Sequence, residues 1–435
     1  MEPPGRSEAA ADATSLAALR SPARKSRVSA AEPRAPQHGV RLLPPFLRTL
    51  LALGVMVAPV LGGVLPEDQA DLMYHSYAGG DITVRGPSVL IRKKVGDSLS
   101  LSYNYYEDMI SSASIDVKLS ASPYHEIRKQ NSFGADYLHG KTTYSLGYIY
   151  SREPDYIAST SYYSISQDMF GDLTTISLGY RRAWDRVYRD LCAAPHPNNQ
   201  ECPDIINDPT FHQRADHRGY TFGLTQILTR NLLANVNYEI DTDQGYLANP
   251  YRQIRYASPG GVGFTLAPQV YPSTRTSNAA SVLLKYYLPW RATLTGSYRF
   301  YHDTFGIVGN TAEADYTMPM WKGWIFDGSL RYYTQTHASF YSDLFPYANY
   351  SNFMARDREL AAFNSWTAGI GASYEFPIPR LPWIHKSTAN IRYDRMMINY
   401  KDFRDALLAA QYGAGSEPLY KLDANVLEVF LSLWY

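Results

Sequence analysis

The clearest pattern of hydrophobic and polar positions lies at the end of the chain, in residues 425–435. Every second residue there is apolar, and polar residues occupy part of the other parity; the apolar positions are Leu427, Val429, Leu431 and Leu433. A period of two predicts a β-strand with two different faces. An apolar strand left as a bare edge in water would invite aggregation, so we expect it to close a barrel against the first strand.

The same alternation recurs from residue 69 onwards, in runs of roughly ten residues that end at turns rich in Gly, Asp, Asn or Pro. In residues 98–105, Leu and Tyr alternate with Ser and Asn. The apolar parity is rich in Tyr, and aromatic residues gather towards the ends of several strands. This distribution favours a lipid-facing surface with an aromatic girdle over the packed core of a soluble barrel or sandwich.

The lengths of the connections predict the topology. Tight turns alternate with long segments at about 107–123, 188–212, 244–273, 338–356 and 400–420. In outer-membrane barrels short turns are periplasmic and long loops are external. We therefore predict an all-β transmembrane antiparallel barrel of about 16 strands, with 14 or 18 left open, and both termini in the periplasm. The strands are expected to start near residues 70, 82, 98, 124, 141, 156, 172, 213, 231, 274, 291, 308, 323, 358, 386 and 421.

The parity opposite to the apolar one carries charged residues on many strands. These candidate lumen charges are Arg181, Glu239, Lys285, Arg299, Asp327, Arg331, Glu375, Arg392, Asp394 and Glu428. Repeated charges on one face require water or partners, so this face is expected to line a polar lumen. Residues 357–359 and 392–404 are dense in Arg and acidic residues; they indicate either a salt-bridged barrel wall or a solute-selecting constriction.

Composition narrows the class of protein. The 435 residues include 41 basic and 41 acidic side chains, 37 Tyr and 16 Phe, and the mean hydropathy is −0.32. The chain is too polar for a helical membrane bundle, and it has no basic stripe for binding nucleic acid. Composition alone would also fit a large soluble β-protein rich in Tyr, so the strand pattern has to decide between the two.

The first 66 residues differ from the rest. Residues 1–40 are rich in Ala, Pro, Ser and Arg without an apolar period, and we expect a disordered or artefactual leader. Residues 41–66 combine basic residues with a short apolar run that ends at Gly62 and Gly63, which is the layout of a signal peptide. The predicted barrel domain is 67–435. No plug-sized region precedes the first strand, which argues against a plugged, energy-coupled transporter.

Segments spread over the predicted mature chain resemble an uncharacterised bacterial outer-membrane β-barrel family that is catalogued as a domain of unknown function. They are residues 86–94, 112–117, 167–175, 246–252, 274–279, 340–345 and the final strand. The resemblance implies an outer-membrane location, and genes for a small lipoprotein, a thioredoxin-like protein and a protein-modifying flavin transferase nearby. Residues 1–40 depart from the family pattern.

The implied partners are outer-membrane lipid, the barrel assembly machinery and a small lipoprotein or redox partner. The end of the chain also resembles the recognition strand of outer-membrane barrels, with Leu431, Leu433 and Tyr435 as the expected assembly signal.

Candidate chemistry outside the lumen is sparse. Cys192 and Cys202 lie in a predicted external loop, where an oxidising compartment favours a disulfide. A metal site with His196 and His212 is the alternative, but the spacing is not a standard zinc pattern. Adjacent pairs such as His75-Ser76 or Asp216-His217 point to opposite faces of a strand and give no indication of a catalytic dyad. No phosphate loop or dinucleotide motif indicates a cofactor.

Three functions follow as hypotheses. The first is a porin-like channel for small solutes, with weak ion selectivity because the lumen charges nearly balance. The second is a barrel scaffold or sheath for a periplasmic or extracellular redox partner. The third is an outer-membrane enzyme, which the absence of a recognisable catalytic arrangement disfavours. A 16-strand barrel is wide enough for a water-filled channel unless loops fill it.

The strand register can be tested at two neighbouring residues of one strand. We expect Leu178→Arg to impair membrane assembly and to cost roughly 2–4 kcal/mol near the bilayer midplane, and Ser177→Arg to be much milder. Heat-modifiable gel mobility reports folding. Equal behaviour of the two variants would contradict the predicted register.

The cysteine pair gives a second prediction. If Cys192 and Cys202 form a disulfide, protein purified from the outer membrane should react with a thiol reagent only after reduction. Closing about ten residues would stabilise this loop by roughly 2–3 kcal/mol in the chain-entropy picture. Immediate labelling of both thiols would show that the disulfide is absent.

Overall fold

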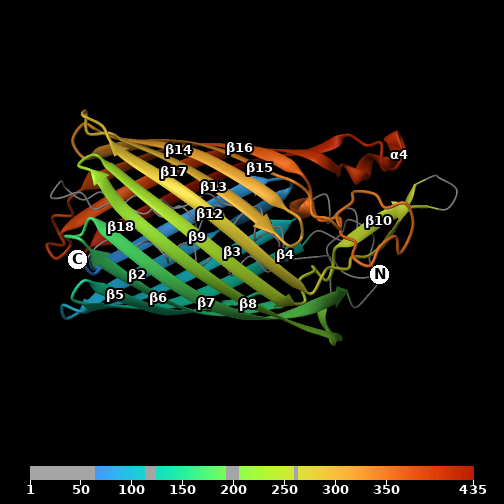
Figure 1. Ribbon diagram of the computed structural model, residues 1–435, viewed down its shortest axis with the longest axis horizontal. Helices are drawn as coiled ribbons and strands as arrows, with labels where there is room; N and C mark the ends of the chain where they lie inside the picture. The colour runs from blue at the N-terminus through green and yellow to red at the C-terminus, as the bar shows by residue number, and fades with distance from the viewer. Residues whose placement is uncertain (1–63, 113–123, 193–204, 259–262) are drawn as a thin grey trace.

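A computed structural model gives the fold and describes residues 64–112, 124–192, 205–258 and 263–435. The predicted leader, most of the predicted signal peptide, Cys202 and the side chain of Cys192 lie outside the described residues. Sixteen antiparallel strands close into a single barrel (Figure 1). The predicted fold class and the number of barrel strands are confirmed.

The barrel strands follow one another around the wall in chain order. Their bounds are β1 (Gln69–Gly79), β2 (Ile82–Val95), β3 (Leu99–Ser112), β4 (Tyr124–His139), β5 (Thr142–Arg152), β6 (Tyr156–Met169), β7 (Thr174–Cys192), β8 (Ile205–Thr229), β9 (Leu232–Gly245), β12 (Thr274–Tyr287), β13 (Thr293–Asp303), β14 (Val308–Met320), β15 (Trp324–Gln335), β16 (Phe363–Phe376), β17 (Lys386–Arg404) and β18 (Leu419–Trp434). A separate hairpin consists of β10 (Gln253–Ala257) and β11 (Phe264–Pro268). The short helical turns are η2 (Arg358–Leu360), η3 (Ala406–Leu408) and α4 (Ala409–Tyr412).

Closure comes from the pairing of β1 with β18, in which Gln69 lies opposite Trp434. Both ends of the barrel chain, Gln69 and Trp434, therefore lie at the same end of the barrel, which we call the turn end because the tight turns at 96–98, 140–141 and 230–231 lie there. At the opposite, or loop, end, three long connections lie wholly or mostly within the described residues. We call residues 246–273 loop A, residues 336–362 loop B and residues 405–418 loop C.

Two of the expected strand starts are wrong. β8 begins at residue 205 instead of 213, because β7 and β8 continue as a two-stranded extension in which Asp190 lies opposite Asn207. The polar residues and Pro209 of this stretch indicated a loop, but strands that lie beyond the bilayer tolerate them. β16 begins at residue 363 instead of 358, because residues 358–360 form the turn η2.

The burial of side chains is inverted relative to a soluble protein. Large apolar side chains of the outward parity are exposed, among them Leu101, Leu146, Leu178, Leu284, Leu330 and Ile370. The inward parity at the same heights is polar, with buried Ser100, Ser132 and Asn235. A continuous exposed apolar band on a closed barrel is the lipid-facing surface of a transmembrane barrel. Within the described residues, no helix has the length and apolarity needed to cross a membrane.

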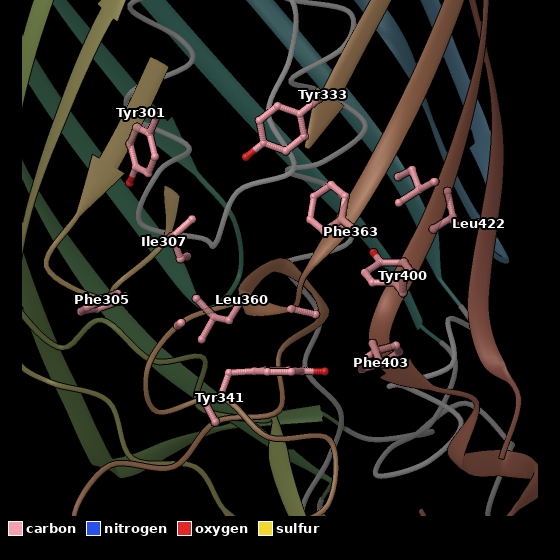
Figure 2. Close-up of a cluster of buried hydrophobic side chains, with 14 of the residues drawn as sticks. Tyr301, Phe305, Ile307, Tyr333, Tyr341, Leu360, Phe363, Tyr400, Phe403 and Leu422 are labelled. Carbon is pink, nitrogen blue, oxygen red and sulfur yellow. The ribbon is translucent and has the colours of Figure 1, made fainter. Parts of the chain in front are cut away.

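The main hydrophobic core lies inside the loop end of the barrel. Figure 2 shows inward side chains of the wall, such as Tyr333, Phe363 and Tyr400, facing Tyr341 and Leu360 of loop B. Phe363 and Leu360 are completely buried. The inward parity thus changes from polar side chains in the middle of the barrel to apolar ones at this end, and the apolar part packs against the loops.

Candidate functional site

The barrel interior contains the candidate site, and its charges form ion pairs along the wall. Arg181 on β7 is paired with Asp241 on β9, although β8 lies between these two strands. Gly219 on β8 makes this possible: a Cβ there would overlap with both the Arg181 side chain and the Asp241 carboxylate. The guanidinium therefore lies flat across the intervening strand and does not project into the lumen.

The opposite wall repeats this arrangement. Arg392 on β17 donates from Nη1 to Asp327 on β15, at 2.5 Å, and from Nε to Asp394, at 3.1 Å. The strand between them is β16, where a Cβ at Gly369 or Gly371 would overlap with these groups. Both ion-pair systems thus depend on an inward-facing glycine in the strand that they cross.

A third pair, Arg299 on β13 with Glu239 on β9, crosses β12 at 2.5 Å. Part of these ion pairs is exposed to solvent: the side chain of Glu239 is 40% exposed and that of Asp327 26%. Water therefore reaches the middle of the barrel wall. Solvent-exposed pairs of this kind contribute little to stability, typically below about 1 kcal/mol.

The other predicted lumen charges lie at different depths. Arg331, Asp394 and Glu428 are almost completely buried, and Arg331 stacks over the Tyr333 ring. Glu375 lies at the turn-end rim, 3.7 Å from Lys386, and is about half exposed. Lys285 is partly buried on β12. The predicted set therefore divides into wall ion pairs, buried groups, one rim residue and the partly buried Lys285, and Asp394 belongs to both of the first two groups.

Loops A and B fill the loop end and form a plug, which sequence reasoning missed. Tyr271 and Leu247 of loop A and Phe340 of loop B are buried in one core with Phe305 and Tyr301. The Tyr271 and Phe340 rings pack edge to face, with centroids 5.2 Å apart. Only the length of the two loops hinted at this arrangement, because their apolar residues have no regular period.

Charged residues of the plug are paired within it. Arg252 of loop A lies 3.2 Å from Glu359 and 3.5 Å from Asp357 of loop B. Burial alone would raise the pKa of Glu359, but Arg252 and the adjacent Arg358 lower it below its ordinary value. Residues 357–359, for which the sequence left a salt-bridged barrel wall or a constriction open, lie in loop B and not in a wall strand.

A second ion-pair cluster connects the plug to loop C. Arg255 on β10 is completely buried and is paired with Asp343 of loop B and Glu417 of loop C. Arg356 of loop B lies 3.0 Å from the same Asp343 carboxylate. Burial alone would raise the pKa of Glu417, but the hydrogen bond from Arg255 and backbone N–H groups lower it. We call these four residues the Arg255 cluster.

Two histidines lie in buried networks near the loop end. His75 on β1 is 2.8 Å from Asp108 on β3, which also binds Arg128. His217 on β8 lies between two carboxylates, at 2.8 Å from Asp243 and 3.4 Å from Asp185. Neither histidine pairs with its sequence neighbour. The strand register brings these groups together, which adjacency in the sequence could not show.

Three buried carboxylates, Glu126, Glu153 and Asp155, have oxygen atoms within 4.8 Å of one another, a spacing that could hold a cation. Asp155 also accepts a hydrogen bond of 2.7 Å from Tyr251 of loop A. Asp155 therefore takes part in the contact between plug and wall. The suggested metal site with His196 lies partly outside the described residues.

The sequence matches the family described as "Protein of unknown function (DUF3570)" over residues 115–394. The chain belongs to this family. The resemblance to an uncharacterised family is thereby confirmed, and the fold of this chain is that of an outer-membrane β-barrel. No curated protein matches the chain.

Solved structures of outer-membrane proteins have related folds. A Pseudomonas aeruginosa FadL homologue is 11% identical, with a TM-score of 0.39 over 85% of this chain and 90% of that chain. A bacterial polysaccharide outer membrane secretin is 8% identical, with a TM-score of 0.44 over 85% and 100%. OmpT of Vibrio cholerae is 10% identical, with a TM-score of 0.38 over 85% and 97%.

The role of the inward glycines can be tested by adding one methyl group. Gly219→Ala should displace the Arg181–Asp241 pair and lower the free energy of unfolding by about 1–3 kcal/mol, the range for overpacking. Gly296→Ala is the matched control, because a Cβ there meets no atom within 4 Å. Urea unfolding in lipid vesicles, followed by Trp fluorescence, measures both variants. Equal stability of the two would contradict the crossing-strand arrangement.

Proposed function

We propose that this protein is an outer-membrane channel for small polar solutes that is closed at rest by its own loops. The observation that carries this proposal is a polar inward face with partly exposed ion pairs, closed at the loop end by a compact apolar plug. In this proposal the loop end faces the cell exterior and the turn end faces the periplasm, as the lengths of the connections suggest.

The wall ion pairs support a channel with weak ion preference. Arg181, Arg299 and Arg392 each have a carboxylate partner on a nearby strand, so the local charges nearly cancel. A lumen of this kind would pass neutral and charged solutes without strong discrimination. In this proposal, ion pairs that lie along the wall leave the barrel axis to the solute.

The plug supports the closed resting state. It joins the inward wall residues in one hydrophobic core, and water would have to enter that core for ions to pass. A conformational change that displaces loops A and B is therefore part of the proposal. Loops that open and close over a site are known to control access to it in many proteins.

A scaffold for a partner protein is the second candidate, and the plug is the observation that favours it. If the plug never leaves the barrel, the polar interior conducts nothing, and the protein presents only its outer loops and periplasmic turns. A redox partner for such a scaffold is suggested only by the family resemblance. The two candidates differ in whether ions pass through the purified barrel.

Recordings in planar bilayers test the channel. We expect the folded full-length protein to be mostly closed, with brief openings under applied voltage and a reversal potential near zero in a salt gradient. Arg299→Gln removes one positive charge beside Glu239 in the lumen, so the reversal potential should shift towards cation preference. Arg331 is a poorer target for this test, because it is buried and its replacement would disturb the fold.

Arg182→Gln is the matched control, because Arg182 is an exposed residue of the outward parity on β7. It should leave the reversal potential unchanged. A folded protein that passes no current at any voltage would rule out the channel and favour the scaffold.

A further inference from the structure

Loops A and B are joined into one body. The Phe345 N–H donates a hydrogen bond to the Arg255 carbonyl, and the Phe345 carbonyl accepts one from the Ala257 N–H; both are 2.9 Å long. Val270 and Met354 exchange a second pair of backbone hydrogen bonds, also at 2.9 Å. Together with the Arg252 ion pairs, these contacts make the β10–β11 hairpin and loop B a continuous unit, so neither loop can leave the barrel mouth alone.

The bases of both loops are narrow. Gly245 N donates to the Ser273 carbonyl at 2.8 Å, which closes loop A where it leaves the wall. In loop B, Ala338 N donates to the Leu360 carbonyl, also at 2.8 Å. Gly245 has φ of 118°, a conformation that only glycine adopts readily. The unit is therefore attached to the wall through short hydrogen-bonded segments at the two loop bases.

Loop C is a separate connection, and it contacts this unit through charged side chains. Glu417 is completely buried, and its carboxylate binds Arg255 and accepts a hydrogen bond of 2.8 Å from Gly415 N. On the wall side, Arg404 N donates to Asp343 at 3.2 Å. In the Arg255 cluster two arginines face two carboxylates, so the buried charge is balanced only while Glu417 is present and ionised.

We infer that Glu417 holds the plug in place, and that loss of its ion pair with Arg255 releases loops A and B together from the barrel mouth. The inference deepens the proposed function, because the release would open the channel. The physical reason is that removing one member of a buried ion pair leaves the other charge without compensation at low dielectric. The resulting loss of stability is larger than the contribution of the ion pair itself. The apolar core then has to hold the plug without loop C.

Hydrogen exchange of the folded full-length protein tests this step without any measurement of current. Glu417→Gln should speed exchange in loops A and B by a similar factor, roughly tenfold to a hundredfold, the range for a lost hydrogen bond to a charged group. Asp423→Asn is the matched control. It removes a carboxylate from an exposed surface pair with Arg395, 2.8 Å apart, and should change nothing in either loop.

Two further variants distinguish charge balance from general loosening. Arg255→Met combined with Glu417→Gln restores neutrality, because Arg356 remains with Asp343; this double variant should exchange more slowly than Glu417→Gln alone. Glu417→Asp keeps the charge and should have an intermediate effect. It also replaces Glu417→Gln if heat-modifiable mobility shows that the latter does not fold.

Unchanged exchange in Glu417→Gln, faster exchange in loop C alone, or an equal increase in Asp423→Asn would overturn the inference. Bilayer recordings of the same samples separate it from the proposed function. Faster exchange in both loops together with more frequent openings supports both. Faster exchange without any current supports the role of Glu417 and rejects the channel.

Discussion

The need to satisfy backbone hydrogen bonds in lipid governs this structure. A strand edge inside a bilayer has no water to bond with, so the first and last strands have to pair, and Gln69 meets Trp434 at the turn end. Closure then fixes the outward and inward parity of every strand. The exposed apolar band and the polar interior both follow from this one constraint, and a shift of one residue in register would exchange them.

Inside the closed wall, water reaches the charged side chains only in part, so they pair with one another. The barrel meets this need along its surface, because the long side chain of Arg181 or Arg392 crosses a neighbouring strand at an inward glycine. The glycines thus provide the space in which these ion pairs form. Their lack of a side chain, more than their flexibility, matters in the middle of these strands.

Many of the inward side chains at the loop end are apolar, unlike those in the rest of the interior. There the wall presents Tyr, Phe, Ile and Leu inward, and loops A and B cover them in a hydrophobic core. The buried ion pairs of the plug hold it in a defined position, because each charge is stable only beside its partner. A polar middle of the barrel and a mouth covered by loops A and B are the basis of the proposed channel.

The sequence by itself determined the barrel, its sixteen strands and the position of nearly every turn. These features are local, since a period of two and a Gly- or Asp-rich turn are visible in any short window. It also pointed to the DUF3570 family, and therefore to the outer-membrane fold.

Only the tertiary structure decided which charges meet. Arg181 and Asp241 are 60 residues apart, and Arg255 and Glu417 are 162 residues apart; register and closure bring them together. The plug was equally hidden, because loops A and B have no regular apolar period and their burial depends on the inward residues of the wall. Contacts set by long-range packing leave no local pattern in the sequence, which is why the closed mouth of the barrel could not be foreseen from it.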